Sequence, residues 1–213
     1  MSKLNTNSNA YIIIYSAVLV VIVAFLLAFV YQALKPMQDA NVELDKEKQI
    51  LSSLNIRGLD DVEADATYHR LLTKVDSVGQ GKERKPYIYY FKVDGNQKYV
   101  FPLKGMGLWG GISGFVSLND DKNTVYGAYF DHESETAGLG AEIKDSQEWQ
   151  EKFQGKKVFD EAGQIAIGVE KKVEDGKKAY EVDAVTGATL TSNGVRDMLR
   201  SGFKQYEKFL KEE

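Results

Sequence analysis

The hydrophobic positions divide the chain into one long apolar segment followed by short patterned segments. Residues 4–34 carry no charged side chain, and their core, residues 11–34, is about as long as a helix that crosses a bilayer, roughly 20 apolar residues. Tyr11, Tyr15 and Tyr31 lie near the ends of this core, where aromatic belts form. No A-x-A cleavage site follows it. The pattern predicts an uncleaved single membrane-spanning helix, with a buried core helix as the alternative.

The basic residues that flank this segment are few. Lys3 precedes it, whereas Lys35, Lys46 and Lys48 follow it. By the positive-inside rule, this small excess places the following domain in the cytoplasm, although a bias of this size is weak support for either side.

Helical spacing of apolar residues recurs after the apolar segment. It predicts a loosely patterned helix over residues 37–55, a short helix over residues 60–75, and another over residues 146–155 that ends at Gly155. From Ser192 onward the spacing predicts a packed amphipathic C-terminal helix. The apolar positions of this last helix are Val195, Met198, Leu199, Gly202, Phe203, Tyr206, Phe209 and Leu210.

Between these helices the pattern changes to that of β-structure. Residues 87–103 contain two β-rich runs around an Asp-Gly pair, which is a strong hairpin signal. Residues 114–130 repeat the pattern around a polar turn, residues 156–170 resemble a further hairpin, and residues 178–185 resemble a strand. The predicted class is α+β, with antiparallel hairpins and flanking helices.

Composition restricts the chemistry that the chain can perform. The 213 residues include no cysteine, so disulfides, thiolate catalysis, Fe–S clusters and thiolate zinc sites are excluded. With only His69 and His132, a multi-histidine metal site is not expected, and we assign no metal ligand. A net charge of −4 without a dense basic cluster argues against a nucleic-acid partner. Redox chemistry would therefore require a bound organic cofactor.

Two glycine-rich segments could approach a ligand. Residues 105–110 fit G-x-G-x-x-G, but the strand-like sequence after them argues against a dinucleotide fold, which needs a helix there. Trp109, the one large residue of this segment, either packs on the core or contacts a ligand or partner. In residues 132–140, Glu133 and Glu135 could form a general acid/base pair or belong to an ordinary solvated loop.

Residues 183–194 place several hydroxyl groups around a Gly-Ala pair at the start of the last helix. The first N–H groups of a helix lack intrahelical partners, and together with the helix dipole they can form an anion site. The alternative is hydroxyl capping by Ser192 or Thr191, which explains one hydroxyl. The four hydroxyl residues are Thr186, Thr189, Thr191 and Ser192.

Residues 183–195, DAVTGATLTSNGV, resemble the flavinylation motif D-x-x-S/T-G-A-T-x-T/S of proteins with an FMN-binding domain. In that family the threonine after Gly-Ala carries FMN through a phosphoester bond, and the matching residue here is Thr189. Residues 105–118, 132–143 and 148–160 are similar to segments of one family with this domain, the C subunits of the Na⁺-translocating NADH:quinone oxidoreductases.

The resemblance extends over nearly the whole chain, with two departures from the family's H-G-E-T-P-G-L-G segment. Ser134 stands where glycine is usual, and Ala137 stands where proline is usual. Both substitutions concern the rigidity of that loop and leave the flavin motif intact.

The resemblance implies which residues hold the cofactor, and it implies no catalytic residue of the chain's own. We expect Thr189 to be the covalent attachment site, with further contacts from its own turn, from Trp109, and from a second loop. The other expected cofactor-binding residues are Asp183, Thr186, Gly187, Ala188, Leu190, Thr191, Trp109, Glu135, Thr136, Gly138 and Leu139.

The resemblance also implies a function. We expect an electron-carrying subunit, not catalytic alone, of a Na⁺-pumping NADH:ubiquinone reductase in the bacterial inner membrane. Electrons would arrive from an Fe–S centre in one neighbouring subunit and leave to a second flavin in another. A separate transferase would attach the FMN, and the soluble domain would be periplasmic, against the weak lysine count.

Two alternatives remain open. The first is the equivalent flavin protein, the G subunit, of an Rnf-type ferredoxin:NAD⁺ oxidoreductase, although the Leu108–Trp109 pair and residues 148–160 favour the quinone reductase. The second, of another class, is a flavin-free membrane-anchored binding or scaffold domain.

The expected domain organisation follows from the segments above. It comprises an N-terminal tail (residues 1–10), a transmembrane helix (11–34), a helical stalk with the start of the soluble domain (35–75), and an FMN-binding domain (76–213).

Overall fold

The computed structural model describes residues 8–77 and 86–212, and the chain divides into two compact units after Asp45. Most of α1 (Asn9–Ser53) forms the described part of the first unit, and this helix continues through Pro36. The apolar side chains of α1 between Ile12 and Leu34 are exposed, and α1 is long and apolar enough to cross a membrane. These features are consistent with the predicted single-pass anchor. The first seven residues of the predicted N-terminal tail lie outside the described part of the chain.

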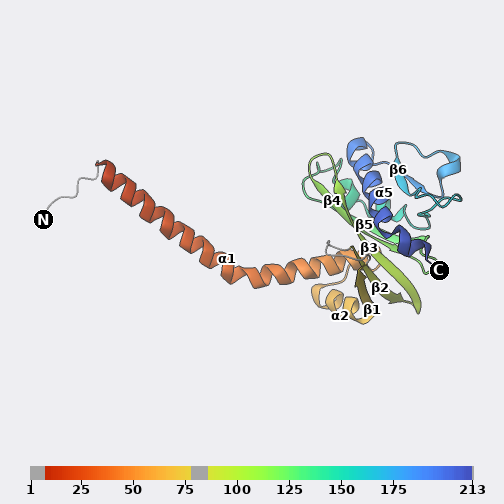
Figure 1. Cartoon of the computed structure of the whole chain (residues 1–213), viewed down its shortest axis with the longest axis horizontal. Helices are drawn as coiled ribbons and strands as arrows, with labels where there is room; N and C mark the ends of the chain where they lie inside the picture. The colour runs from red at the N-terminus through yellow and green to blue at the C-terminus, as the bar shows by residue number, and fades with distance from the viewer. Residues whose placement is uncertain (1–7, 78–85, 213) are drawn as a thin grey trace. The chain divides into compact units, whose positions relative to one another are not determined.

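The second unit is built around a five-stranded antiparallel sheet in which strands adjacent in sequence pair with each other (Figure 1). The hairpin predicted around the Asp-Gly pair is confirmed as β2–β3, and the next predicted hairpin is confirmed as β4–β5. The strands are β1 (Leu72–Ser77), β2 (Tyr87–Val93), β3 (Asn96–Met106), β4 (Gly111–Leu118) and β5 (Val125–His132).

The sheet buries apolar side chains on both faces, because successive residues of a strand point to opposite sides. On β3, Phe101 and Leu103 belong to the main core beneath the C-terminal helix α5 (Thr189–Lys211), while Val100 is buried on the opposite face. The predicted α+β class with antiparallel hairpins and flanking helices is therefore confirmed.

The helix α5 packs the predicted apolar face onto the sheet. The ring of Tyr206 lies 4.9 Å from that of Phe101, measured between centroids, in an edge-to-face arrangement. Its hydroxyl donates to the backbone carbonyls of Tyr87 and Pro102, each at 3.1 Å. These contacts fix α5 against β2 and β3 and thereby determine where its N-terminus lies.

The opposite face of the sheet is covered by the last turns of α1 and by α2 (Asp61–Leu71). The ring of Tyr68 on α2 packs edge-on against Phe91 of β2, with 5.5 Å between centroids. The hydroxyl of Ser117 on β4 donates to the carbonyl of Ser53 at 2.5 Å. The sheet is thus the middle layer of this unit.

The helix predicted over residues 37–55 is confirmed, and it continues α1 as far as Ser53. The extent of the next predicted helix was wrong. The helix predicted over residues 60–75 ends at Leu71, and β1 begins at Leu72. The backbone of β1 pairs with β2, so tertiary hydrogen bonding overrides the local helical pattern there.

The hairpin predicted over residues 156–170 was also wrong. An isolated antiparallel bridge replaces it, and β6 (Gly168–Glu170) pairs in parallel with β7 (Glu181–Asp183). The 3₁₀-helix η1 (Asp175–Lys177) lies between these two strands in sequence. β7, which was predicted as a strand, is the last element before the turn that leads into α5.

Two short helices connect β5 to this region. They are α3 (Glu142–Asp145) and α4 (Gln147–Glu151), and the second confirms the predicted short helix in a shorter form. The hydroxyl of Ser146 caps α4 by accepting from the N–H of Trp149 at 3.2 Å. The chain then turns at Gly155, which has a φ of 75°.

Candidate flavin-binding site

Three loops of the second unit meet and line a cavity of about 350 Å³. Residues 107–110 connect β3 to β4, residues 133–141 connect β5 to α3, and residues 184–188 lead from β7 into α5. The cavity is lined by Leu108, Trp109, Glu135, Thr136, Leu139, Gly140, Gly187, Ala188, Thr189, Leu190 and Thr191.

The helix α5 begins at Thr189, so the predicted start at Ser192 was three residues late. Ala188 occupies the N-cap position without a side-chain capping bond, so capping by Thr191 or Ser192 was the wrong alternative. The hydroxyl of Ser192 accepts instead from the N–H of Val185 at 3.1 Å. Thr191 is buried, whereas Thr189 is exposed at the cavity. The geometry thus separates the buried hydroxyls of Thr191 and Ser192 from the exposed ones of Thr186 and Thr189, and of the exposed pair Thr189 lines this cavity.

The turn before α5 depends on Gly187. Its φ of 77° lies in the left-handed region, which glycine adopts without steric cost. A Cβ at this position would lie 2.9 Å from a methyl carbon of Leu139, so the turn also approaches the β5–α3 loop closely. The start of the turn is held by Asp183, whose carboxylate accepts from the N–H of Val173 at 2.9 Å.

Glu135 connects all three sides of the cavity although it is itself buried, with 7% of its surface exposed. One carboxylate oxygen accepts from the hydroxyl of Thr191 at 2.5 Å, and the other accepts from the N–H of Trp109 at 2.8 Å. Burial alone raises the pKa of Glu135. Hydrogen bonds from Thr191 and from the N–H groups of Trp109, Gly110 and Leu108 outweigh the burial and hold this pKa below its usual value.

An exposed apolar rim surrounds the cavity. Trp109 has 67% of its surface exposed, so packing of Trp109 on the core was the wrong alternative. Three leucines also line the cavity with much of their surface exposed: Leu108, Leu139 and Leu190. Met106, at the end of β3, is exposed as well. Apolar walls with few polar groups are typical of cofactor sites.

Most of the residues expected to bind the cofactor meet at this cavity. Those that line it are Gly187, Ala188, Thr189, Leu190, Thr191, Trp109, Glu135, Thr136 and Leu139. Three others lie outside it. Thr186 and Gly138 line a neighbouring hollow, and the carboxylate of Asp183 is engaged with Val173.

Sequence reasoning did not assign Leu108 and Gly140, which also line the cavity. The signal was present in both cases. Leu108 belongs to the G-L-W segment beside Trp109, and Gly140 closes the loop that contains Glu135. A Cβ at Gly140 would lie 2.5 Å from the carboxylate of Glu135 and 2.6 Å from the hydroxyl of Thr191, so only glycine leaves room for that pair.

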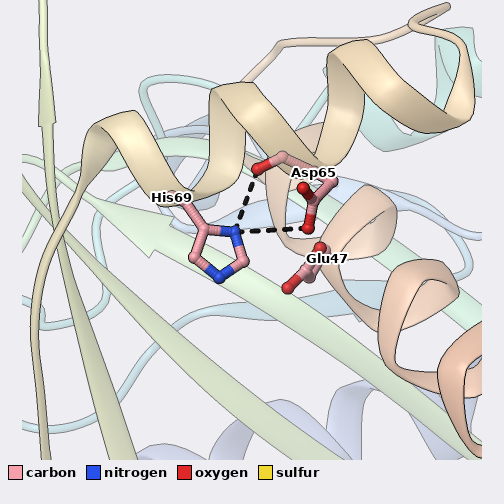
Figure 2. A group of neighbouring side chains, drawn as sticks. All are labelled: Glu47, Asp65 and His69. Atoms are coloured by element: carbon pink, nitrogen blue, oxygen red, sulfur yellow. Dashed lines mark hydrogen bonds and ion pairs between the residues drawn. The ribbon is translucent and has the colours of Figure 1, made fainter.

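A second cluster of ionisable side chains lies on α2 and the last turns of α1. Figure 2 shows Glu47, Asp65 and His69, whose ligand-type atoms all lie within 4.8 Å of one another. Glu47 is buried and the other two are exposed. Nδ1 of His69 lies 3.0 Å from the carbonyl oxygen and 3.4 Å from a carboxylate oxygen of Asp65, one helical turn earlier. These contacts within α2 account for the position of the imidazole, and we assign no ion to the cluster.

Comparisons with known proteins agree with the geometry of the cavity. Residues 107–204 match the FMN-binding domain family. The chain is 29% identical to the C subunit of the Na⁺-translocating NADH-quinone reductase of Haemophilus ducreyi, over 95% of this chain and 93% of that protein. It is likewise 29% identical to the C subunit from Pseudomonas aeruginosa, over 92% and 91% of the two chains.

A solved structure shows the same fold. The crystal structure of the C subunit from Parabacteroides distasonis superimposes with a TM-score of 0.78 at 36% sequence identity, covering 84% of this chain and 98% of that one. This identity and coverage, together with the domain match, identify the chain as a member of the family of C subunits of the Na⁺-translocating NADH-quinone reductases.

Proposed function

We propose that this chain carries electrons in a Na⁺-translocating NADH-quinone reductase by means of FMN bound covalently to Thr189. The observation that carries the proposal is the position of Thr189: its side chain is exposed in an apolar-walled cavity, on the first residue of α5. The covalent bond and the individual contacts are proposals, whereas the FMN-binding domain and the subunit family are established above.

The residues of the cavity fit FMN. At the start of α5, N–H groups without intrahelical partners and the positive end of the helix dipole favour an anion. A phosphoester on Thr189 would place its negative charge at this helix end. Trp109, Leu139 and Leu190 supply apolar surface for the aromatic isoalloxazine ring. The ring would provide the redox chemistry, while the protein positions it and controls access of water.

The proposed attachment reaction transfers the flavin phosphate from FAD to Thr189 and releases AMP. FAD is the source of the flavin phosphate in the proposed reaction, and a separate transferase catalyses it. The hydroxyl oxygen of Thr189 attacks the phosphorus on the riboflavin side, an oxygen–phosphorus bond forms, and the pyrophosphate bond breaks to release AMP. The hydroxyl proton leaves to a base on the transferase. No oxidant or reductant is consumed.

The proposed partners are the other subunits of the pump, including an Fe–S donor and a second flavin protein as acceptor. The single apolar helix α1 anchors the chain, and we propose residues 11–34 as its membrane-spanning part. Sodium transport belongs to partners with several spans, because one helix cannot enclose a path. We place the second unit outside the cytoplasm, where a lost noncovalent flavin could not be replaced readily.

The attachment is tested on full-length protein produced together with the transferase. Intact mass should exceed the polypeptide mass by one FMN less one water, and the denatured band should fluoresce in a gel. Thr189→Val should lose both signals, while Thr67→Val, on α2 at the opposite face of the sheet, should keep them. Unmodified wild-type protein, or a fluorescent Thr189→Val band, would refute the proposal.

The side of the membrane on which the second unit lies can be tested independently. Because the chain contains no cysteine, a single introduced cysteine can be labelled specifically. A single cysteine introduced at the exposed Glu161 should react with a membrane-impermeant maleimide in cells whose inner membrane is intact. Labelling that requires disruption of the inner membrane would place the domain in the cytoplasm instead.

A further inference from the structure

The carboxylate of Glu135 fills a slot that the backbone leaves open for it. A Cβ at Gly107 would lie 2.5 Å from one of its oxygens, and a Cβ at Gly140 would lie 2.5 Å from the other. The slot is therefore shaped by two glycines on different loops. The oxygens are already engaged with Trp109 and Thr191, and little of the side chain is exposed.

The hydrogen bond between Thr191 and Glu135 also affects Thr189, the proposed attachment residue, which lies in the same turn of α5. In an α-helix, residues two positions apart point in directions about 200° apart around the axis. Accordingly, Thr191 is buried toward Glu135 while Thr189 is exposed to the cavity. Holding Thr191 from inside thus fixes the rotation of the first turn of α5 and the direction of the Thr189 hydroxyl.

The β3–β4 loop is held by the same side chain. The carboxylate accepts from the N–H of Trp109 at 2.8 Å, and the N–H of Glu135 itself donates to Nδ1 of His132 at 3.2 Å. One side chain thus joins the β3–β4 loop, the β5–α3 loop and the first turn of α5. Both carboxylate oxygens of Glu135 accept hydrogen bonds from the protein, unlike the exposed side chains of the cavity wall, which are accessible to a ligand.

We propose that Glu135 is a positioning residue for flavin attachment: its carboxylate fixes the first turn of α5 against the β3–β4 loop and presents the Thr189 hydroxyl, without itself contacting the flavin. This role differs from the expected one, in which Glu135 contacts the cofactor directly. The inference rests on Thr189 being the attachment site. The test below can disprove the role of Glu135 while Thr189 remains the attachment site.

The test measures the rate of flavin attachment to full-length protein by intact mass. Loss of this hydrogen bond to a charged group should slow attachment roughly tenfold or more. Thr191→Val and Glu135→Gln should both show this loss. Thr191→Ser keeps the hydroxyl and should restore a rate close to wild type.

The matched control is Glu133→Gln. Glu133 belongs to the same loop, but it is exposed, and its carboxylate accepts from the N–H of Gly111 on β4 at 3.1 Å. This variant should attach flavin at the wild-type rate. A wild-type rate in Thr191→Val would overturn the inference while leaving Thr189 as the attachment site. A wild type that acquires no flavin would overturn the function proposed above instead.

A second readout separates positioning from contact with the flavin. In the Thr189→Val background no flavin is attached, and hydrogen exchange of the amides at residues 188–192 can be measured directly. Adding Glu135→Gln or Thr191→Val should accelerate their exchange at least threefold, whereas adding Glu133→Gln should not. If Glu135 acted only by touching the flavin, these amides would exchange at the same rate in all four proteins.

Discussion

Gly194 of α5 lies directly on the backbone of Met106 at the end of β3. A Cβ at position 194 would clash with the carbonyl oxygen of Met106 and lie 3.2 Å from the Cα of Gly107. The first turns of α5 and the glycine-rich β3–β4 loop are therefore in van der Waals contact without a side chain between them. This contact fixes the distance between the β3–β4 loop and α5, which both contribute residues to the cavity.

Gly194→Ala should therefore destabilise the second unit. Alanine favours a helix over glycine by about 1 kcal/mol, but here the methyl group must push α5 away from backbone atoms, at a cost of about 1–3 kcal/mol. We expect thermal unfolding to occur several degrees lower, together with slower flavin attachment. Gly176→Ala is the control, since a Cβ there meets no atom within 4 Å. An equal or higher Tm in Gly194→Ala would show that α5 can shift freely.

Stability should depend on pH through Glu135. Its folded pKa is lowered from the value of 4.5 expected in the unfolded chain, so the ionised form is favoured by folding. The contribution is complete above pH 4.5 and is lost as the pH falls below 4.5 through the folded pKa. The Tm difference between wild type and Glu135→Gln should be largest near pH 7 and should shrink below pH 4.5.

Two other ionisable groups lie on the same loop and need controls. His132 accepts from the N–H of Glu135, and Glu133 accepts from the N–H of Gly111. Repeating the measurement in the His132→Gln and Glu133→Gln backgrounds removes each of these groups in turn, and the Tm difference caused by Glu135→Gln should still shrink below pH 4.5. A difference that stays constant between pH 7 and pH 4 would mean that folding does not lower the pKa of Glu135.

Much of the fold follows from local sequence signals. The Asp-Gly pair predicts the β2–β3 turn because both residues adopt positive φ, 50° at Asp94 and 81° at Gly95. The apolar spacing after Ser192 predicts the buried face of α5. Local signals did not predict the pairing of β1 or β6. Each of these strands is stabilised by hydrogen bonds to the next strand in sequence, which a local pattern does not show.

The sequence predicted most of the residues of the candidate site, but not how their side chains are oriented relative to one another. The motif around Thr189 and the Glu135 loop pointed to the same ligand, and both line the cavity. The sequence could not show that Thr191 points inward to Glu135 while Thr189 faces out, because this depends on where α5 begins. It also gave no sign that Asp183 supports the turn through Val173.

Tyr206 should contribute to stability through its hydroxyl as well as its ring. Burial raises the pKa of this hydroxyl, and it donates to the carbonyls of Tyr87 and Pro102. Tyr206→Phe should lower the free energy of unfolding by about 1 kcal/mol, measured by denaturant titration. Tyr87→Phe, which alters an exposed side chain but leaves its carbonyl in place, should change it by less than about 0.5 kcal/mol. Equal values for the two variants would show that the hydroxyl of Tyr206 contributes nothing.

Trp109 should act on the flavin and not on the fold. With 67% of its surface exposed, its removal creates no cavity, so Trp109→Ala should keep the Tm within about 2 °C of wild type. Trp149→Ala, which empties a buried site, should cost about 3–5 kcal/mol. In the flavin-loaded native protein, an indole in contact with the isoalloxazine quenches its emission. Fluorescence per attached flavin should therefore rise in Trp109→Ala, and an unchanged yield would place Trp109 at a protein contact away from the ring.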